Sequence, residues 1–471
     1  MSALWSSAEA AAATKGQTKT EWNAAGVSID SRTVIAGDLF VAIAGPRVDG
    51  HDFVAAALAK GASAAMVHRR PDNLAENAPL LLVADTMAAL EDLGRASRQR
   101  TEASVIAVTG SVGKTGTKEA LRTALEKFGM VHASAGSLNN QWGVPLSLAR
   151  MPRKANYAVF ELGMNHAGEI DALSRQVRPD VAIITTIEPA HLGFFDSVEA
   201  IADAKAEIFA GMDRRGAAIL NRDNPHFGRL AAAAEAVGLT RIYGFGGNPD
   251  ASIRLIDCHL HATASAVTAS IMGEIVDYCL TLPGRHWVMN SLAVLGAVKL
   301  VGGDVGIAAA SMSSLVPLAG RGKQHRLNLA SGQVILIDES YNASPASMRA
   351  AIEVLGAARP GAGGRRIAVL GDMLELGDQA GKLHAALADP LDTAGIDLVF
   401  TVGADMRALH DALPVERRGN HSDSAATMAK LLAKQLRPGD IITIKGSHGS
   451  HMSEVVIHLL TLAAPAYAVK G

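Results

Sequence analysis

One glycine-rich segment of the sequence could bind a polyphosphate. It follows the apolar run SVIAVTG and precedes a segment of helical period, which is the order of a phosphate-binding loop. The glycines let backbone N–H groups turn toward phosphate, Lys114 adds positive charge, and the Thr115 hydroxyl suits Mg²⁺. Kinases, ATPases and ligases share this cradle, so it predicts ATP but no reaction. The expected ATP-binding residues are Thr109, Gly110, Ser111, Val112, Gly113, Lys114, Thr115 and Gly116.

Three polar residues farther along the chain could serve the same chemistry. Glu161 ends the apolar run YAVFELG, His191 follows VAIITTI, and Lys205 lies in DAKAEIF. Carboxylates and histidines just beyond parallel strands gather at one edge of a sheet, where ligands bind. The residues alone leave ordinary alternatives open: a solvated carboxylate at a strand end, a packing histidine and a lysine on a helix surface.

The pattern of apolar runs predicts the elements that must position these residues. Strands are expected at 38–44, 61–68, 79–86, 104–110, 157–163, 181–187, 217–221, 334–340, 366–372, 397–403 and 440–446. Helical spacing separates them, notably at 87–100 and from about Lys118 onward. This alternation is typical of an α/β fold with doubly wound, mainly parallel sheets.

Length divides the predicted fold into domains. A chain of 471 residues exceeds what one core usually supports. We expect a small α/β domain at 1–100, a central P-loop domain with a mainly parallel sheet at 101–321, and a C-terminal Rossmann-like domain at 322–471.

Composition excludes several classes of function. The 44 basic and 46 acidic residues give a net charge of −2 without a basic stripe, which argues against nucleic acid. Cys258 and Cys279 offer no Cys-x-x-Cys spacing, so a disulfide framework or thiolate zinc site is not expected. No signal sequence or membrane-spanning apolar run is recognisable, so we expect a cytoplasmic protein, without membrane insertion and monomeric.

A series of motifs resembles the Mur ligases over nearly the whole chain. In order they are IDSRTVIAGDLFVAIAGPRVDGHDF, TGSVGKTGTKE, SLNNQWGVP, ELGMNHAGEI, EPAHLGFF, AKAEIF, LPGRHWVMN, AGRGKQHR, IDESYNASPASM, VLGDMLELG and KGSHGSHM. The resemblance implies an ATP-dependent ligase that forms a peptide bond through an acyl phosphate. Within the family the motifs are similar to members that add D-alanyl-D-alanine to UDP-N-acetylmuramoyl-tripeptide, giving the pentapeptide precursor of peptidoglycan, ADP and phosphate.

The resemblance also assigns residues. It implies that Lys114, Glu161, His191 and Lys205 are catalytic, and that Thr115, Glu161, His191 and a carbamylated Lys205 hold two Mg²⁺. It adds Asn290, Arg321, Asp338 and Asn342 to the ATP site. It places the UDP-muramoyl and peptide substrates against Ser31, Arg32, Asp49, Gly50, His51, Asn139, Asn140, Lys445 and Ser447.

Some positions depart from the family pattern or have simpler interpretations. Trp287 stands where an asparagine is expected after His286, and His448 where relatives often have arginine. IDSR could be a turn and Asn139-Asn140 an ordinary loop. An amino-acid-adding sibling or a folylpolyglutamate synthase is the nearest rival, against which IDSR and DGHDF favour a UDP-sugar. A nucleotide-switch protein would leave Glu161, His191 and Lys205 unexplained.

Overall fold

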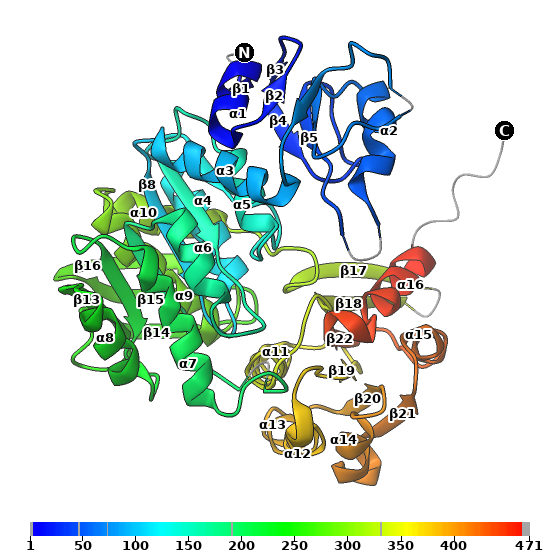
Figure 1. The fold of residues 1–471 in the computed structure, drawn as a ribbon. Coiled ribbons are helices and arrows are strands. Elements are labelled where there is room, and N and C mark those ends of the chain that lie inside the picture. Colours follow the sequence, from blue (N-terminus) through cyan, green and yellow to red (C-terminus); the bar gives the residue numbers. More distant parts are fainter. Residues whose placement is uncertain (1–2, 46–47, 73, 190–191, 330–331, 464–471) are drawn as a thin grey trace.

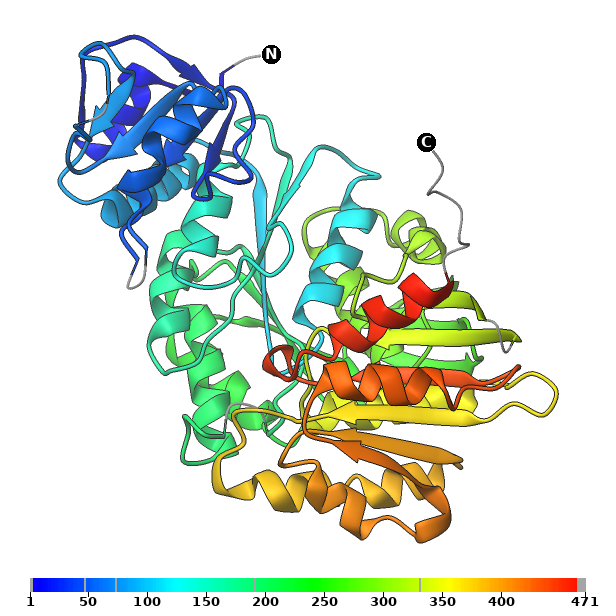
Figure 2. The ribbon, with the colours of Figure 1, turned by 90° about the vertical axis from the view of Figure 1, so that its right-hand side faces the viewer.

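Three α/β domains follow one another along the chain, each built on its own sheet (Figure 1). The computed structural model describes residues 3–45, 48–72, 74–189, 192–329 and 332–463. The N-terminal domain lies above the other two in Figure 1, and the third domain lies beside the central one in Figures 1 and 2. The predicted α/β class with three domains is confirmed.

The N-terminal domain contains a five-stranded sheet in the order β2-β7-β6-β5-β4 and a small β1-β3 pair. The strands are β1 Trp5–Ser6, β2 Gln17–Thr18, β3 Asn23–Ala24, β4 Gly26–Ser28, β5 Asp38–Val41, β6 Ala64–Val67 and β7 Leu80–Leu82. The helices are α1 Ser7–Thr14, α2 Val54–Ala59 and α3 Thr86–Gln99. Strands β4 to β7 run parallel, while β2 joins β7 antiparallel at the edge.

A nine-stranded sheet of order β16-β15-β14-β13-β12-β11-β8-β10-β9 forms the central domain. Its strands are β8 Ser104–Thr109, β9 Val131–Ala133, β10 Tyr157–Glu161, β11 Val181–Ile184, β12 Ala217–Asn221, β13 Arg241–Gly246, β14 Ile253–Leu260, β15 Ser265–Ile271 and β16 Glu274–Leu280. Its helices are α4 Lys114–Leu125, α5 Gly143–Ala149, α6 Glu169–Val177, α7 Val198–Ala206, α8 Phe227–Ala236, α9 Arg285–Leu300 and α10 Val305–Ser311.

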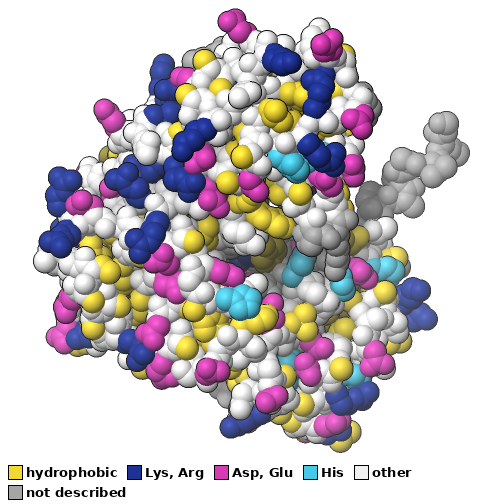
Figure 3. Space-filling model, in the orientation of Figure 1, with side chains coloured by type: hydrophobic (Ala, Val, Ile, Leu, Met, Phe, Trp, Pro, Cys, Tyr) yellow, Lys and Arg dark blue, Asp and Glu magenta, His cyan; other side chains and the backbone are white. Residues whose placement is uncertain are grey.

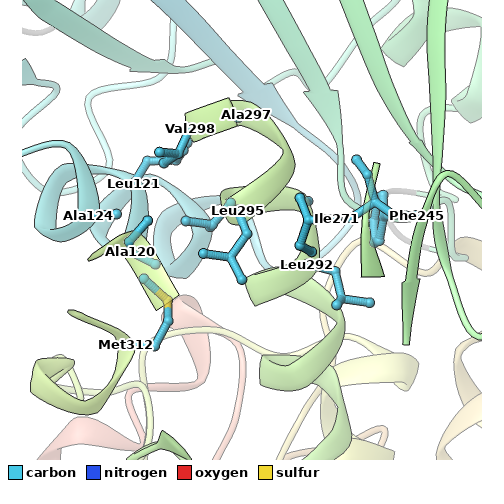
Figure 4. Close-up of a cluster of buried hydrophobic side chains, with 14 of the residues drawn as sticks. Ala120, Leu121, Ala124, Phe245, Ile271, Leu292, Leu295, Ala297, Val298 and Met312 are labelled. Atoms are coloured by element: carbon cyan, nitrogen blue, oxygen red, sulfur yellow. The ribbon is translucent and has the colours of Figure 1, made fainter. Parts of the chain in front are cut away.

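Helices cover both faces of this central sheet. Alternate residues of β8 enter different cores: Ile106 and Val108 join one cluster of buried side chains, while Val105 and Ala107 join another. The first cluster packs α4 against α9, as Figure 4 shows for Leu121 and Val298 among others. Strands buried on both faces read as continuous apolar runs, which is why they were predictable.

The third domain has a six-stranded sheet of order β17-β18-β22-β19-β20-β21, parallel except for β17. The strands are β17 Lys323–Leu329, β18 Gly332–Glu339, β19 Arg366–Gly371, β20 Leu398–Val402, β21 Arg418–Ser422 and β22 Ile441–Lys445. The helices are α11 Pro345–Ala357, α12 Ala380–Ala385, α13 Ala388–Thr393, α14 Arg407–Ala412, α15 Ala425–Ala433 and α16 Ser453–Ala463.

Each strand predicted from the sequence is present, but one helix start was wrong. Helix α4 begins at Lys114, not near Lys118, because Gly113 caps it with a φ of +86° and the chain enters the helix directly. The sequence did not predict the short strands β1 to β4, the edge strands β9 and β21, the strands β13 and β14, or the antiparallel strands β15, β16 and β17. Within the described residues no helix is long and apolar enough to cross a bilayer.

Candidate active site

The predicted phosphate loop connects β8 to α4 and is fastened to the end of β11. The Thr185 hydroxyl donates to the Val112 carbonyl at 2.5 Å, and a Cβ on Gly110 would lie 1.9 Å from that hydroxyl oxygen. Lys114 Nζ donates to the Gly110 carbonyl at 2.7 Å. No side chain in the described chain caps the start of α4. The first N–H groups of this helix are therefore available to an anion.

Glu161, the last residue of β10, buries its carboxylate beside this loop. Its side chain belongs to a residue only 1% exposed, so the alternative of a solvated strand end is wrong. Asn139 Nδ2 donates to Glu161 Oε1 at 2.7 Å, whereas Oε2 has no hydrogen-bond partner among the described residues. A buried carboxylate oxygen costs free energy unless a cation or donor satisfies it. Glu161 Oε2 is therefore suited to a cation.

Lys205 lies in the last turn of α7 and is 1% exposed, so the surface-lysine alternative is also wrong. Burial lowers the pKa of the Lys205 amine well below its ordinary value, and the nearby charge of Lys114 lowers that pKa further. Burial likewise lowers the pKa of Lys114, while Glu161 acts in the opposite direction. The predicted ligand His191 lies outside the described residues.

Lys445 and Ser447 lie at the end of β22 and just beyond it. Lys445 Nζ donates to the Asn342 carbonyl at 2.9 Å and is 3.4 Å from Glu339 Oε2. Burial lowers the pKa of Lys445, which Glu339 partly offsets. The backbone N–H of Leu374 donates to Ser447 Oγ at 2.9 Å. Both residues thus hold neighbouring loops of the third domain in place.

The connection between the central and third domains is held by Asp338. Its carboxylate accepts hydrogen bonds from Gly320 N at 2.8 Å and from Ser340 Oγ at 2.6 Å. The adjacent Arg321 guanidinium lies 4.0 Å from the centre of the Tyr341 ring, in cation–π contact. Both oxygens of the Asp338 carboxylate therefore accept hydrogen bonds from within the protein.

One cavity of about 980 Å³ collects most of the predicted residues. It lies between the central and third domains, and Figure 3 shows this face hollowed near its centre. Its lining includes Ser111, Val112, Gly113, Lys114, Thr115, Gly116, Asn139, Asn140, Glu161, Asn290, Arg321, Asn342, Lys445 and Ser447. The predicted residues Thr109, Gly110, Asp338 and Lys205 are not part of that lining.

The cavity offers oxygen atoms that could bind a metal. Among the described residues, no group of three or more His, Cys, Asp and Glu side chains could hold an ion by itself. Glu161 Oε2 lacks a hydrogen-bond partner in the described part of the chain, and Thr115 is buried on the same cavity wall. Mg²⁺ is usually bound through a few protein oxygens together with substrate phosphates, so these two residues fit it.

Family models match most of the chain. The Mur ligase family catalytic domain matches residues 23–98, the Mur ligase middle domain 108–298, and the Mur ligase glutamate ligase domain 325–448. The chain is 34% identical to UDP-N-acetylmuramoyl-tripeptide--D-alanyl-D-alanine ligase of Rickettsia prowazekii, covering 96% of this chain and 99% of that one. The Escherichia coli ligase of the same name is 36% identical, with 91% and 92% covered.

The chain belongs to the Mur ligase family. Solved structures agree: MurF from Acinetobacter baumannii superposes with a TM-score of 0.84 at 30% identity, covering 97% of this chain and 99% of that one. MurF ligase from Thermotoga maritima, solved in complex with ADP, gives a TM-score of 0.77 at 27% identity, with 93% and 97% covered.

Two of the predicted substrate residues of this Mur ligase, Ser31 and Arg32, lie in an exposed turn of the N-terminal domain. The Arg32 backbone N–H donates to Asp30 Oδ1 at 2.9 Å, and Arg32 Nη2 donates to Asp30 Oδ2 at 2.7 Å. The Arg32 side chain is 87% exposed. The turn that the sequence left open as an alternative is thus present, and it presents a guanidinium to solvent.

The neighbouring Asp49-Gly50-His51 segment is internally bonded. His51 Nδ1 is 2.7 Å from Asp49 Oδ1, and the His68 backbone N–H donates to His51 Nε2 at 3.1 Å. Because that N–H can only donate, Nε2 is unprotonated and Nδ1 carries the proton. The His51 N–H and ring, with Arg69, hold the pKa of Asp49 well below its ordinary value. Both ring nitrogens of His51 are therefore engaged in hydrogen bonds within the protein.

Trp287, which departs from the family pattern, packs against the first turn of α4. A Cβ on Gly116 would lie 2.5 Å from Trp287 Cη2, so the indole requires glycine there. The Asn290 amide occupies a similar place beside Gly113, where a Cβ would lie 2.9 Å from Nδ2. The tryptophan and the glycine are therefore a matched pair in this chain.

Sequence reasoning missed Tyr341, Ser137 and Lys118. The Tyr341 hydroxyl donates to Ser137 Oγ at 2.5 Å, joining two domains through residues far apart in sequence. Nothing local signals that contact. Lys118 is fully buried. It shares the helical stripe of Leu121 and Leu125, and that position on an apolar face was a signal of burial.

Proposed function

We propose that this Mur ligase joins D-alanyl-D-alanine to UDP-N-acetylmuramoyl-tripeptide, converting ATP to ADP and phosphate. The observation that carries the proposal is that Lys114, Thr115 and Glu161 line one cavity together with Lys445 and Ser447. Glu161 Oε2 has no hydrogen-bond partner among the residues that the structure describes. The names of the relatives that are 34% and 36% identical over nearly the whole chain support this choice of substrates.

The cavity suits activation of a carboxylate by ATP. Joining a carboxylate to an amine in water is uphill, so the acid is first converted to an acyl phosphate, which the amine then attacks with release of phosphate. The Lys114 ammonium and the uncapped start of α4 reduce the repulsion between the γ-phosphoryl group and the carboxylate. The third-domain wall of the cavity shields the acyl phosphate from water.

Two Mg²⁺ ions belong to this proposal. Thr115 and Glu161 would hold one ion, and His191 with a carbamylated Lys205 the other. Bound Mg²⁺ supplies positive charge to the phosphoryl oxygens of ATP. The low pKa of Lys205 supports carbamylation, because only a neutral amine reacts with CO₂.

The proposed division of labour follows the order of the domains. Residues 1–100 hold the UDP-muramoyl end, 101–321 hold ATP, and 322–471 bring the dipeptide amine to the acyl phosphate. Asn290, Arg321 and Asn342 line the nucleotide side, while Asp338 supports it through Gly320. The proposal includes a cytoplasmic location, with which the two free cysteines agree, and a monomeric enzyme.

Phosphate release tests the proposal directly. The enzyme is incubated with ATP, Mg²⁺ and UDP-muramoyl tripeptide carrying lysine or diaminopimelate, with and without D-alanyl-D-alanine, and product mass is measured. A dipeptide-dependent rate and a pentapeptide product are expected. A rate that depends on a single amino acid instead would assign the chain to a sibling activity, and ATP binding without turnover would favour a nucleotide switch.

A further inference from the structure

Lys118 is a fully buried lysine that the reaction scheme leaves unused. It lies on α4, one turn after Thr115, and is 0% exposed. Lys118 Nζ donates to the Ser134 carbonyl at 2.6 Å and to the Gly136 carbonyl at 2.7 Å, and lies 2.9 Å from Glu119 Oε1. These three acceptors match the three N–H bonds of an ammonium group.

Both carbonyls belong to the loop 134–142, which joins β9 to α5. Within it the Asn139 backbone N–H donates to the Ser137 carbonyl at 2.8 Å, and the Asn139 carbonyl accepts from Gly163 N at 2.8 Å. From that position Asn139 Nδ2 reaches Glu161 Oε1 at 2.7 Å. The place of the loop thus decides which Glu161 oxygen is engaged and which is left for a cation.

The same loop also receives the third domain, because Ser137 Oγ accepts the hydrogen bond of the Tyr341 hydroxyl. Lys118 therefore stands where three parts of the site meet. Its own helix begins at the phosphate loop, and the carbonyls that accept its hydrogen bonds lie at the N-terminal end of the loop 134–142. That loop in turn contacts both Glu161 and Tyr341.

Burying a lysine at this position costs desolvation free energy, which its hydrogen bonds must offset. A methionine of similar size would fill the space without removing a charge from water. Without the ammonium, the Ser134 and Gly136 carbonyls would lose this donor. The buried charge is therefore explained by the hydrogen bonds that fasten the loop to α4.

We propose that Lys118 is a positioning residue of the ligase reaction, holding the loop 134–142 so that Asn139 orients the Glu161 carboxylate and Ser137 meets Tyr341. This inference rests on the proposed function for its catalytic consequence. The mechanical part, the fastening of the loop to α4, is independent of any substrate.

Lys118→Met tests the proposal against Lys299→Met as a matched control. Lys299 is also a helix lysine of the central domain that donates to a backbone carbonyl, Ile271 O at 2.9 Å, and pairs with Glu274 at 2.9 Å, but it reaches the outer strands. Amide hydrogen exchange needs no substrate. Exchange over 134–142 should quicken roughly tenfold or more in Lys118→Met and stay unchanged in Lys299→Met. Equal protection in both variants would overturn the proposal.

Kinetics supply the second readout. Lys118→Met should lower kcat by roughly a hundredfold, the scale of a misplacement of about 1 Å, while the calorimetric Kd for ADP changes less than about threefold. Losses in kcat from Lys118→Met and Asn139→Ala should not add in the double variant, because they break one chain of contacts. A wild-type kcat, or additive losses, would refute the positioning role.

A third variant covers the case in which Lys118→Met does not fold. Asn139→Ala leaves Lys118 and the core around it intact, and should alone lower kcat with little change in ADP affinity. If Asn139→Ala has wild-type kcat, Lys118 has nothing to position and the inference is wrong. Hydrogen exchange separates this failure from inactivity of the wild type on the proposed substrates.

Discussion

The Tyr341 hydroxyl donates a hydrogen bond to Ser137 Oγ and thereby ties the third domain to the loop 134–142 of the central domain. The Arg321 guanidinium packs over the same ring at 4.0 Å from its centre, so both the hydroxyl and the ring face of Tyr341 are in contact. A backbone hydrogen bond from Gly193 N to the Glu375 carbonyl at 2.9 Å is a second tie between the domains. Such contacts hold the central and third domains together around the cavity.

Tyr341→Phe should weaken closure without disturbing the fold. One neutral hydrogen bond contributes about 0.5–1.5 kcal/mol, so kcat/KM for ATP should fall roughly threefold to tenfold while the unfolding midpoint is unchanged. Steady-state phosphate release measures this. Tyr243→Phe is the control, because Tyr243 lies partly buried in β13 and its hydroxyl bonds no described residue. Equal kinetics in both variants would contradict a role in closure.

Gly116→Ala should disturb the start of α4, although alanine is the better helix former. The new Cβ would lie 2.5 Å from the Trp287 ring, so the indole must shift, at a cost of about 1–3 kcal/mol. Gly228→Ala in α8 is the matched control: its Cβ would meet no atom within 4 Å, and the variant should gain about 0.4–1 kcal/mol. Urea unfolding measures both. A stabilised Gly116→Ala variant would contradict this prediction, because it would show that the Trp287 ring can shift at little cost in free energy.

The sequence predicted well the parts of the fold that carry a local signal. Buried parallel strands such as β8 and β11 are continuous apolar runs, and the phosphate loop is a contiguous motif. The start of α4 was placed too late because the loop residues themselves begin the helix. The antiparallel strands β15 and β16 were missed because they lack the continuous apolar runs on which the strand predictions rested, although β15 alternates between buried and more exposed residues.

The site was predictable only where function and motif coincide. Glu161 and Lys205 could be named, but their burial depends on tertiary packing that composition does not reveal. The roles of Asp338 and His51 as internal hydrogen-bond partners likewise depend on residues distant in sequence, Gly320 and His68. Contacts between domains, such as that of Tyr341, carry no local pattern at all.

Acid should destabilise the protein partly through His132. Its Nε2–H donates to the Ser147 carbonyl at 2.7 Å, and burial, aided by Arg150, lowers its pKa from 6.5 to about 4. Between these values the unfolded chain binds a proton that the folded chain does not. The free energy of unfolding should therefore fall by up to about 3 kcal/mol as pH drops through that window, with no such loss above it.

His132→Gln isolates this contribution, because glutamine keeps an N–H donor and does not titrate. Urea unfolding from neutral pH down to pH about 4 should give a flatter dependence on pH for the variant than for the wild type. His286, whose pKa burial also lowers to about 4, acts in the same direction in both proteins and cancels in the comparison. Parallel curves would exclude His132.

Lys205→Ala should lose most activity and recover part of it with small carboxylic acids. Burial lowers the pKa of this amine well below its ordinary value, which favours the neutral form that reacts with CO₂. The resulting carbamate is an anion where the family resemblance expects a ligand. In the alanine variant, formate or acetate can occupy the space of the missing lysine side chain and replace the carbamate anion. Phosphate release is measured with each acid and with chloride at equal ionic strength. Rescue by chloride as well, or wild-type activity without any acid, would remove the carbamate from the mechanism, whereas rescue confined to carboxylates requires an anion at the end of residue 205.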